Sequence, residues 1–502
     1  SIANSLGRLQ TLKIWDCSQL EEIIQGSEVS DINLQSLREV EEIANFEDMR
    51  LLPIERIIQG SKVSNISLQS LREVEVRNCN NLMYLFPMSI ANSLRRLRTL
   101  QISDCSQLEE IIQGSEVSNI SLQSLREVKV ENCNNLRYLF PMSFANSLGG
   151  LQTLERCFGL EEIIKAKKES NICLYSLIEV FVRECNMLTS LSSVSHGRIL
   201  KSLTKLEIYD CLQLEHTFPI SMAQGLPLLN EVVLEDLPQF KGRDGNEIVL
   251  TLSSLQKLKV VNCPGLITSS IISAKIQLFD SSYNLSSLKF LSLMELTELR
   301  VIWNGSIQAV NFQNRNLPRL SVLRIFDYEE LEQIIENDQT SSQHHLQPIC
   351  FPSLAEVSIR DCENLKYLFP VTFAYGGVLK LKTISLEKVS KLEKVFEGDE
   401  ANVSKDEEKV IHLPQLTDLK LSELPNLMSF SSVSYHFVFP SLEDLKVEGC
   451  PNITTRFSVD PKQSVHAKTQ ASQSDDETIV EESAAAQETT WPAGSDISWW
   501  AF

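Results

Sequence analysis

The sequence predicts an elongated α/β solenoid whose core is one curved parallel β-sheet, because a repeat of 20 to 30 residues marks stacked units. The pattern L-x-x-[LIV]-x-[ILV]-x-x-[CLVY]-x-x-[LIF] recurs about sixteen times in 502 residues, usually 26 to 28 residues after its last appearance. Each copy is centred on an L-x-[ILV] segment with the period of a strand. Ten of the twelve cysteines also occupy one place in the pattern.

These units are leucine-rich repeats, and we expect residues 1–456 to form a single solenoid domain. Alternate residues of each short strand should point into the core, while the others line the concave face. A solenoid grows by adding units to one elongated core, so the number of domains cannot be estimated from the length of the chain. The first leucine of each unit falls at residues 9, 37, 71, 97, 125, 151, 177, 203, 229, 255, 288, 320, 354, 381, 416 and 442.

The convex side of each unit is expected to carry short helices, 3₁₀ turns and loops. Two kinds of segment alternate there: L-E-E-I-I-Q-G, as at 108–114, and L-x-Y-L-F-P-M-S-x-A-N-S-L, as at 82–94. In the second kind, Ser89 or Ser143 could cap one helical turn. The alternation gives a 54-residue period near the N-terminus, which indicates duplication, and residues 41–56 break the pattern. We expect an irregular unit at 41–56.

Residues 457–502 have no repeat and are rich in Ser, Gln, Thr, Asp and Glu. This composition predicts a disordered acidic tail. The tail ends in aromatic residues, which could be a docking peptide or the product of an out-of-frame or alternatively spliced end. Those aromatic residues are Trp491, Trp499, Trp500 and Phe502.

The cysteines are predicted to be packing residues. A small thiol placed where the chain leaves its strand can donate to a neighbouring carbonyl, and Leu or Val takes the same place in other units. Reduced thiols favour a cytoplasmic protein. The ten are Cys17, Cys79, Cys105, Cys133, Cys157, Cys185, Cys211, Cys263, Cys362 and Cys450.

The charge excludes two classes of partner. The 46 basic and 66 acidic residues give a net charge of -20, which repels nucleic acid and anionic membranes. The chain contains no 18-residue apolar stretch and no signal-peptide pattern at its start. Because it opens inside a repeat at Ser1, we expect a fragment of a longer protein. Neither end offers a clear polar cap, so we expect the isolated chain to associate or to be poorly soluble.

No catalytic, cofactor or metal site is expected. The phosphate-binding, dinucleotide-binding, zinc-protease and nucleophile-elbow motifs are all missing from the sequence. The pair His344-His345 lies in a polar insertion without further metal ligands at suitable spacing. Acidic pairs such as Glu109-Glu110 recur with the repeat, which indicates a solvated face. We therefore predict a non-enzymatic protein that needs no cofactor.

The concave face is where the units differ. In the N-terminal units it is polar, as at Glu73, Glu75 and Arg77, whereas apolar and aromatic residues gather on several later strands. Such a patch is what a protein-binding hot spot requires, although a convex insertion or a neighbouring domain could cover it instead. The candidate protein-binding residues are Phe181, Tyr209, Val261, Phe290, Met294, Val322 and Phe326.

The Cys-centred strand, the Y-L-F-P-M-S-x-A-x-S-L segments and the F-P-S-L phrase at 351–354 and 439–442 resemble the leucine-rich region of plant intracellular coiled-coil, nucleotide-binding and LRR disease resistance proteins. The resemblance covers about residues 1–456. It implies a cytoplasmic innate immune receptor segment that senses pathogen effectors, or host proteins altered by them, and holds the nucleotide-binding domain inactive. The signalling coiled coil and the nucleotide-binding domain with its phosphate loop are not in this sequence, so the chain alone is not expected to bind nucleotide.

Two alternatives from other classes remain at this point. A substrate-receptor subunit of a ubiquitin ligase would need an F-box before Ser1. A receptor ectodomain would need paired cap cysteines and glycans, for which the chain carries six N-x-[ST] sequons.

Overall fold

A computed structural model gives the fold of the 502-residue chain. The structure describes the placement of part of its residues. These are residues 9–18, 20, 22–24, 56–58, 68–87, 93–113, 122, 124–141, 153–165, 178–189, 191, 202–215, 227–240, 254–266, 268–269, 276–279, 285–296, 298–303, 317–335, 351–374, 378, 380–398, 409–432 and 435–469.

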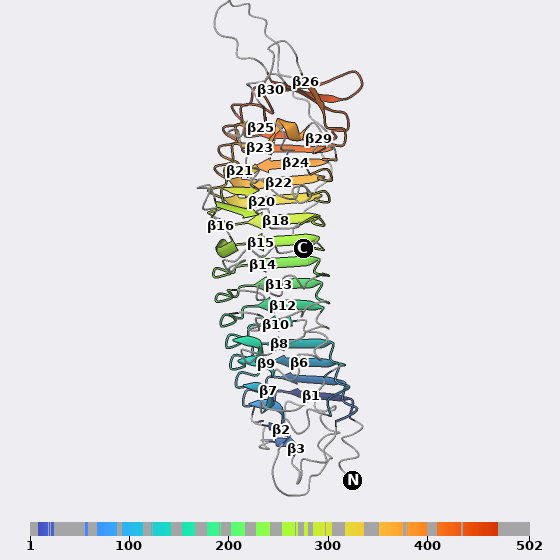
Figure 1. Ribbon diagram of the computed structural model, residues 1–502, viewed down its shortest axis with the longest axis vertical. Helices are drawn as coiled ribbons and strands as arrows, with labels where there is room; N and C mark the ends of the chain where they lie inside the picture. The colour runs from blue at the N-terminus through green and yellow to red at the C-terminus, as the bar shows by residue number, and fades with distance from the viewer. Residues whose placement is uncertain are drawn as a thin grey trace, which may run out of the picture.

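One 15-stranded parallel sheet runs the length of the molecule, as Figure 1 shows, and confirms the predicted leucine-rich repeat solenoid. Each strand comes from one unit and pairs with the next strand in the stack. The strands, in spatial order, are β1 (Thr11–Trp15), β4 (Glu73–Arg77), β6 (Thr99–Ser103), β8 (Glu127–Glu131), β10 (Thr153–Glu155), β12 (Glu179–Arg183), β13 (Lys205–Tyr209), β14 (Glu231–Glu235), β15 (Lys257–Val261), β18 (Phe290–Met294), β20 (Val322–Tyr328), β22 (Glu356–Cys362), β24 (Thr383–Glu387), β27 (Asp418–Ser422) and β29 (Asp444–Glu448).

The apolar residues of the repeat form the core because strand side chains alternate between the two faces of a sheet. In β4 the second and fourth residues, Val74 and Val76, are buried, and they lie beside Leu100 and Ile102 of β6 in the parallel register. The same register continues from strand to strand, so each buried side chain packs on its equivalents in the neighbouring units. The buried residues of these strands therefore form one continuous core.

A residue with left-handed backbone conformation, with φ between 47° and 65°, directly follows each strand of the main sheet, except in β20 and β22, where it is the last residue but one of the strand. Asp and Asn fill many of these positions because they tolerate that conformation better than other non-glycine residues. The Asn78 side-chain amide donates to Asp16 at 2.7 Å, and Asn132 donates to Asp104 and Asn262 to Asp236 at the same distance. This row of turns was not predicted, although Asp or Asn stands before the cysteine in many units.

The cysteine follows this turn, and its thiol donates to the carbonyl two residues earlier, as from Cys105 to Ser103 at 3.4 Å. All ten repeat cysteines lie in the described residues and are free thiols. Burial raises the pKa of Cys263 to about 12, so that thiol stays protonated at neutral pH. The hydrogen bonds and burial support the predicted packing role.

The convex side carries short strands and 3₁₀ turns, and the described residues contain no α-helix. The sequence predicts short helices there as well, but Ser89 and Ser143 lie outside the described residues. Both kinds of convex segment are extended, and their apolar residues pack on the core. The elements are β3 (Arg56–Ile58), β2 (Glu22–Ile24), β5 (Tyr84–Pro87) and β7 (Glu110–Gln113) in one sheet; β9 (Tyr138–Pro141) and β11 (Glu162–Lys165); β16 (Thr268–Ser269), β17 (Ile276–Phe279), β19 (Val301–Trp303) and β21 (Gln333–Ile335); β23 (Tyr367–Pro370) and β25 (Lys394–Glu397); and the turns η4 (Pro264–Leu266) and η6 (Val371–Phe373).

The unit that begins at Leu37 adds no described strand to the main sheet. β1 pairs directly with β4, with Thr11 beside Glu73, although the two strands are 62 residues apart in the chain. β3 instead pairs with β2, on the side away from β5. The main sheet therefore has one strand fewer than the sixteen predicted units, because the unit at Leu37 is passed over. Most of the predicted irregular segment 41–56 lies outside the described residues.

The predicted tail boundary at residue 457 is wrong. β30 (Thr455–Val459) and β31 (Val465–Thr469) form an antiparallel hairpin, and β31 also pairs antiparallel with β28 (Tyr435–Phe439), which lies beside β26 (Lys409–His412). Ala467 of the hairpin is buried. Residues 470–502, including the terminal tryptophans, lie outside the described residues, as do His344 and His345.

Candidate protein-binding surface

The central patch is a group of apolar and aromatic residues on three adjacent strands, β15, β18 and β20. We define it as Val261, Phe290, Met294, Val322 and Phe326. In the parallel register Val261 lies beside Met294, and Met294 beside Phe326, while Phe290 lies beside Val322. The sheet thus brings five of the seven predicted residues together across neighbouring units.

The other two predicted residues form a separate aromatic pair. Phe181 of β12 and Tyr209 of β13 have ring centroids 5.4 Å apart with the planes tilted by 40°. β14 lies between this pair and the central patch and presents Glu231 and Glu235 on the same face. The predicted surface is therefore two apolar groups with a charged strand between them.

Exposure separates residues that a partner can reach from residues that support them. Phe290, Met294 and Phe326 are half-buried, but Val261 is only 5% exposed. Val233, in the middle of β14, was not predicted and is 3% exposed. Val261 is therefore the residue of the patch that a partner can reach least, and its part in binding stays a prediction.

Cations surround the rings of the central patch. On β15, Lys257 Nζ lies 6.0 Å from the ring centroid of Phe290. On β20, the Arg324 guanidinium carbon lies 5.5 Å from the same centroid. The Arg360 guanidinium carbon lies 5.0 Å from the centroid of Phe326. Each distance is within the range of cation–π attraction.

Carboxylates hold two of these cations in place. Lys257 Nζ is 2.7 Å from Glu231, and Arg324 is 2.9 Å from Glu356. These side chains are partly exposed, so the ion pairs themselves contribute little stability. The patch consists of rings inside a border of ion pairs, and an apolar centre with a polar rim is the organisation of protein interfaces.

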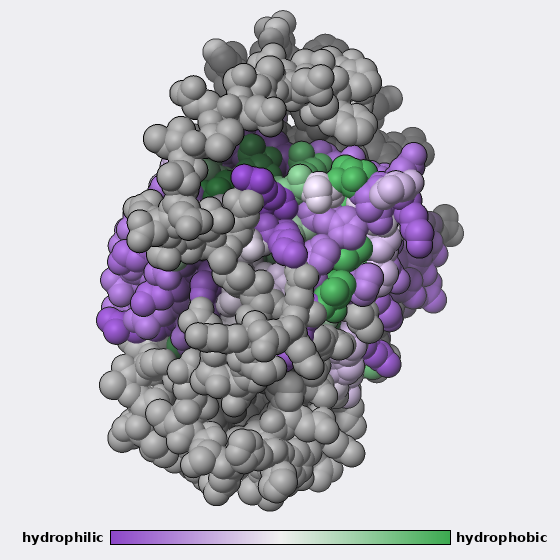
Figure 2. Space-filling view, turned by 90° about the horizontal axis from the view of Figure 1, so that it is seen from above, coloured by the Kyte–Doolittle hydropathy of each residue, from purple (hydrophilic) through white to green (hydrophobic). Residues whose placement is uncertain are grey.

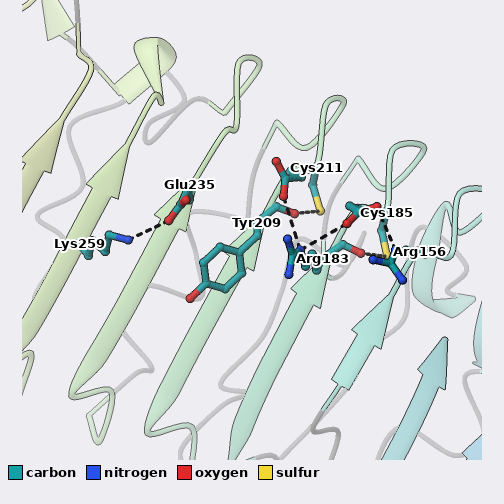
Figure 3. A network of polar contacts seen from close by, with 9 residues as sticks. Arg156, Arg183, Cys185, Tyr209, Cys211, Glu235 and Lys259 are labelled. Atoms are coloured by element: carbon teal, nitrogen blue, oxygen red, sulfur yellow. Dashed lines mark hydrogen bonds and ion pairs between the residues drawn. The ribbon is translucent and has the colours of Figure 1, made fainter. Parts of the chain in front are cut away.

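A second polar network borders the aromatic pair (Figure 3). Arg183 lies 3.4 Å from Glu184 and 3.6 Å from Asp210, at the ends of β12 and β13, and Lys259 pairs with Glu235 at 2.9 Å. Burial and the nearby Asp236 raise the pKa of Asp210, despite the opposing effect of Arg183. Carboxylates on successive turns thus make this edge of the sheet acidic.

Tyr209 remains a neutral phenol in this setting. Burial, together with the nearby carboxylate of Glu207, raises its pKa to about 12. Figure 3 shows its ring lying across the face of the sheet. Tyr209 can therefore offer a partner both an aromatic face and a hydroxyl donor.

Exposed apolar residues also occur in the turns that follow the cysteines of three consecutive units. Phe158, Met187 and Leu212 are 40%, 43% and 51% exposed. Most other described units have polar residues, Pro or Gly in these turns. The sequence carries this signal, because the turn follows each cysteine directly.

The N-terminal strands confirm the expected polar face, with one exception. Glu75 of β4 pairs with Lys13 at 3.3 Å and with Arg77 at 2.6 Å. Trp15 of β1, which was not predicted, is 39% exposed, with Lys13 and Arg77 within 6 Å of its ring. A single ring among charges is a smaller apolar surface than the central patch.

Among the described residues, no group of three or more His, Cys, Asp and Glu side chains is arranged to hold a metal ion. No helix in the described part of the chain is long and apolar enough to cross a bilayer.

The family model of plant disease resistance protein RPS2-like leucine-rich repeats matches residues 1–106, 96–158 and 341–466, which is more than half of the chain. The chain belongs to this family. Neither the ubiquitin-ligase nor the ectodomain alternative is favoured by this membership. The RPS2-like repeats of this chain are a leucine-rich region of the plant resistance type, as the sequence motifs predicted.

Two solved structures are also similar to this RPS2-like region. One is the plant peptide hormone receptor RGFR1 in complex with RGF2, at 13% identity, with 88% of this chain and 79% of the receptor chain covered and a TM-score of 0.16. The other is a TLR13–ssRNA13 complex, at 14% identity, with 72% and 71% covered and a TM-score of 0.14.

Proposed function

We propose that this chain is the non-enzymatic protein-recognition region of a cytoplasmic plant innate immune receptor. Its concave face binds a pathogen effector, or a host protein changed by one. The same region contributes to holding the receptor's nucleotide-binding domain inactive until that binding occurs. Family membership and the central patch support this proposal.

The single observation that carries the proposal is the border of cations and carboxylates around the half-buried rings of the central patch. Burying Phe290 and Phe326 under a partner would remove apolar area from water and strengthen the attraction of Arg324 and Arg360 to the rings, because desolvation increases electrostatic interactions. Large aromatic residues inside a ring of less important contacts carry most of the affinity of many interfaces. A protein partner fits this chemistry better than a small metabolite, since the rings lie on neighbouring strands of an extended sheet.

The autoinhibitory part of the proposal requires two exclusive binding states. A ligand can shift a conformational equilibrium only by its different affinity for the two states. If the nucleotide-binding domain and the effector compete for the concave face, effector binding releases that domain. The buried, protonated thiols of the cysteine column fit the reducing interior of a cell.

The test replaces Phe290, Met294 and Phe326 together with serine in the full chain. We expect the triple variant to lose ~30-fold or more in affinity for the receptor's separately expressed nucleotide-binding domain and for its effector, since the loss of even one hot-spot residue costs about 2 kcal/mol. Binding is measured by pull-down and calorimetry.

The control changes Thr99, Gln101 and Ser103 to alanine on β6, where all three outward positions are polar. This control should bind as the unchanged chain does. Circular dichroism verifies that both variants fold. Undiminished binding by the folded serine variant would refute the site, and equal loss in both variants would show that the central patch has no special role.

A further inference from the structure

The last strand of the main sheet, β29, is unlike the strand before it. Leu445 and Val447 occupy its core positions yet are 37% and 38% exposed, whereas the equivalent Leu419 and Leu421 of β27 are 1% and 0% exposed. All five residues of β29 are exposed. The core of the solenoid is therefore open to solvent at this end.

The hairpin covers only the convex half of the same end. β31 pairs with β28, and Thr469 donates to the carbonyl of Ser431 at 2.9 Å, while Ala467 fills the core. No described strand covers the outer edge of β29, which is last in the order of the main sheet. Figure 2 looks onto this end of the solenoid and shows apolar surface between hydrophilic side chains.

The opposite end of the sheet cannot receive this edge in a head-to-tail stack. Leu12 and Ile14, the core residues of β1, are 2% and 1% exposed, so that end has no open core for Leu445 and Val447. A contact between the two different ends would also build open filaments, whereas a contact between two identical ends closes on itself.

The charges of β29 suit pairing with an identical strand. The outward residues Asp444, Lys446 and Glu448 alternate with the apolar pair. In an antiparallel pair whose two-fold axis passes through Leu445, each Lys446 faces Asp444 of the other strand, and with the axis through Val447 it faces Glu448. An axis through any of the three outward residues brings like charges together. Opposite charges directly across a strand pair attract by ~0.2–1 kcal/mol.

The usual protection of edge strands is incomplete here. Natural edges are blocked by inward-pointing charges, proline, bulges or covering elements. β29 has no proline and points leucine and valine inward. Its outward Lys446 is tied to Glu448 at 2.7 Å, with side-chain exposures of 53% and 62%. Backbone pairing with a second strand would cover the two apolar residues and satisfy the edge.

We propose that two copies of this chain join end to end through antiparallel pairing of their β29 strands, forming a symmetric dimer with one continuous sheet. This contact is separate from the concave face and does not depend on what that face binds. It doubles the number of recognition surfaces in one assembly.

The test measures mass by light scattering and backbone amide exchange of β29 in the full chain over a range of concentrations. We expect twice the 56.8 kDa monomer mass at high concentration, with β29 amides protected there and exchanging on dilution. Lys446→Glu makes all three outward residues acidic, so it should weaken the dimer at least ~10-fold. Lys462→Glu, in the exposed hairpin turn, changes the net charge equally and should leave the dimer intact.

Charge exchange identifies the register. Asp444→Lys combined with Lys446→Glu restores the dimer if the axis passes through Leu445, and Lys446→Glu combined with Glu448→Lys restores it if the axis passes through Val447. Rescue by one pair supports the proposal. A monomer at all concentrations would overturn it, whether β29 exchanges freely or is protected by the chain's own residues. A dimer that persists in the Lys446→Glu variant would also overturn the proposal. The same holds if neither charge-exchange variant restores the dimer.

Discussion

The N-terminal strands β4 to β8 and the central strands β15 to β20 share one core and differ in their outward residues. Inward, Val76 and Leu293 are both fully buried at equivalent positions. Outward, β6 presents Thr, Gln and Ser, whereas β18 presents Phe, Ser and Met. Side chains alternate along each strand between the two faces of the sheet. One face builds the core, and the other is the face that we propose for recognition.

The largest effect on the free energy of unfolding is expected from substitutions in the core that the two regions share. Leu100→Ala on β6 and Leu323→Ala on β20 each remove a side chain that is at most 1% exposed. Each should lower the free energy of unfolding by ~2–5 kcal/mol, because both lose burial and leave a cavity. Urea denaturation followed by circular dichroism measures both. A large loss in only one region would show that the core is not equivalent along the sheet.

A smaller and equal effect in both regions is expected at the turns. Asn132→Ala and Asn262→Ala each remove a 2.7 Å hydrogen bond and place alanine at a positive φ. Each should cost ~1–2 kcal/mol of folding free energy. Asn132→Gly removes the same bond but accepts the backbone conformation, so its cost should be smaller. Equal costs for alanine and glycine would show that the conformation contributes nothing.

The cation–π contacts should distinguish the two regions. A double-mutant cycle between Arg360→Ala and Phe326→Leu should give a coupling energy of ~0.5–1 kcal/mol, since the cation is 5.0 Å from the ring. The corresponding N-terminal cycle, Gln101→Ala with Glu127→Ala, tests a long 3.4 Å hydrogen bond and should give less. A larger coupling energy in the N-terminal cycle than in the Arg360–Phe326 cycle would contradict the distinction between the two regions.

The smallest effect on stability is expected at the Asp210 carboxylate, which follows β13 between the two regions. The raised pKa of Asp210 means that the folded chain disfavours its charge, so the ionised group lowers stability above its folded-state pKa. This loss disappears as the pH falls below the pKa of the unfolded chain. Asp210→Asn should therefore stabilise the chain slightly at pH 7 and not at pH 2, as measured by thermal unfolding. An equal gain at both pH values would exclude the ionised carboxylate as its cause.

The repeat phase predicted the core and the outward columns because a parallel ladder keeps equivalent residues side by side. It therefore placed Phe290, Met294 and Phe326 on one face correctly. It could not predict that Val261 is buried, since exposure depends on neighbouring units. Nor could local sequence show that the stack passes from β1 to β4, because any two units of the same phase can pair.

The hairpin at the C-terminal end was missed for a different reason. Val465 and Ala467 alternate with polar residues, and Asp460, Pro461 and Lys462 mark a turn before them, which together are the pattern of a hairpin. The acidic composition of residues 457–502 as a whole obscured this local signal. Composition averaged over a long segment therefore hid a short ordered element within it.

The direct pairing of β1 with β4 has a consequence for how such a chain can change over generations. The main sheet continues in unbroken register although 62 residues separate the two strands in the chain. Gain or loss of a whole unit by unequal recombination would thus leave the backbone register of the remaining strands intact. The number and order of outward surfaces could then vary without breaking the parallel ladder.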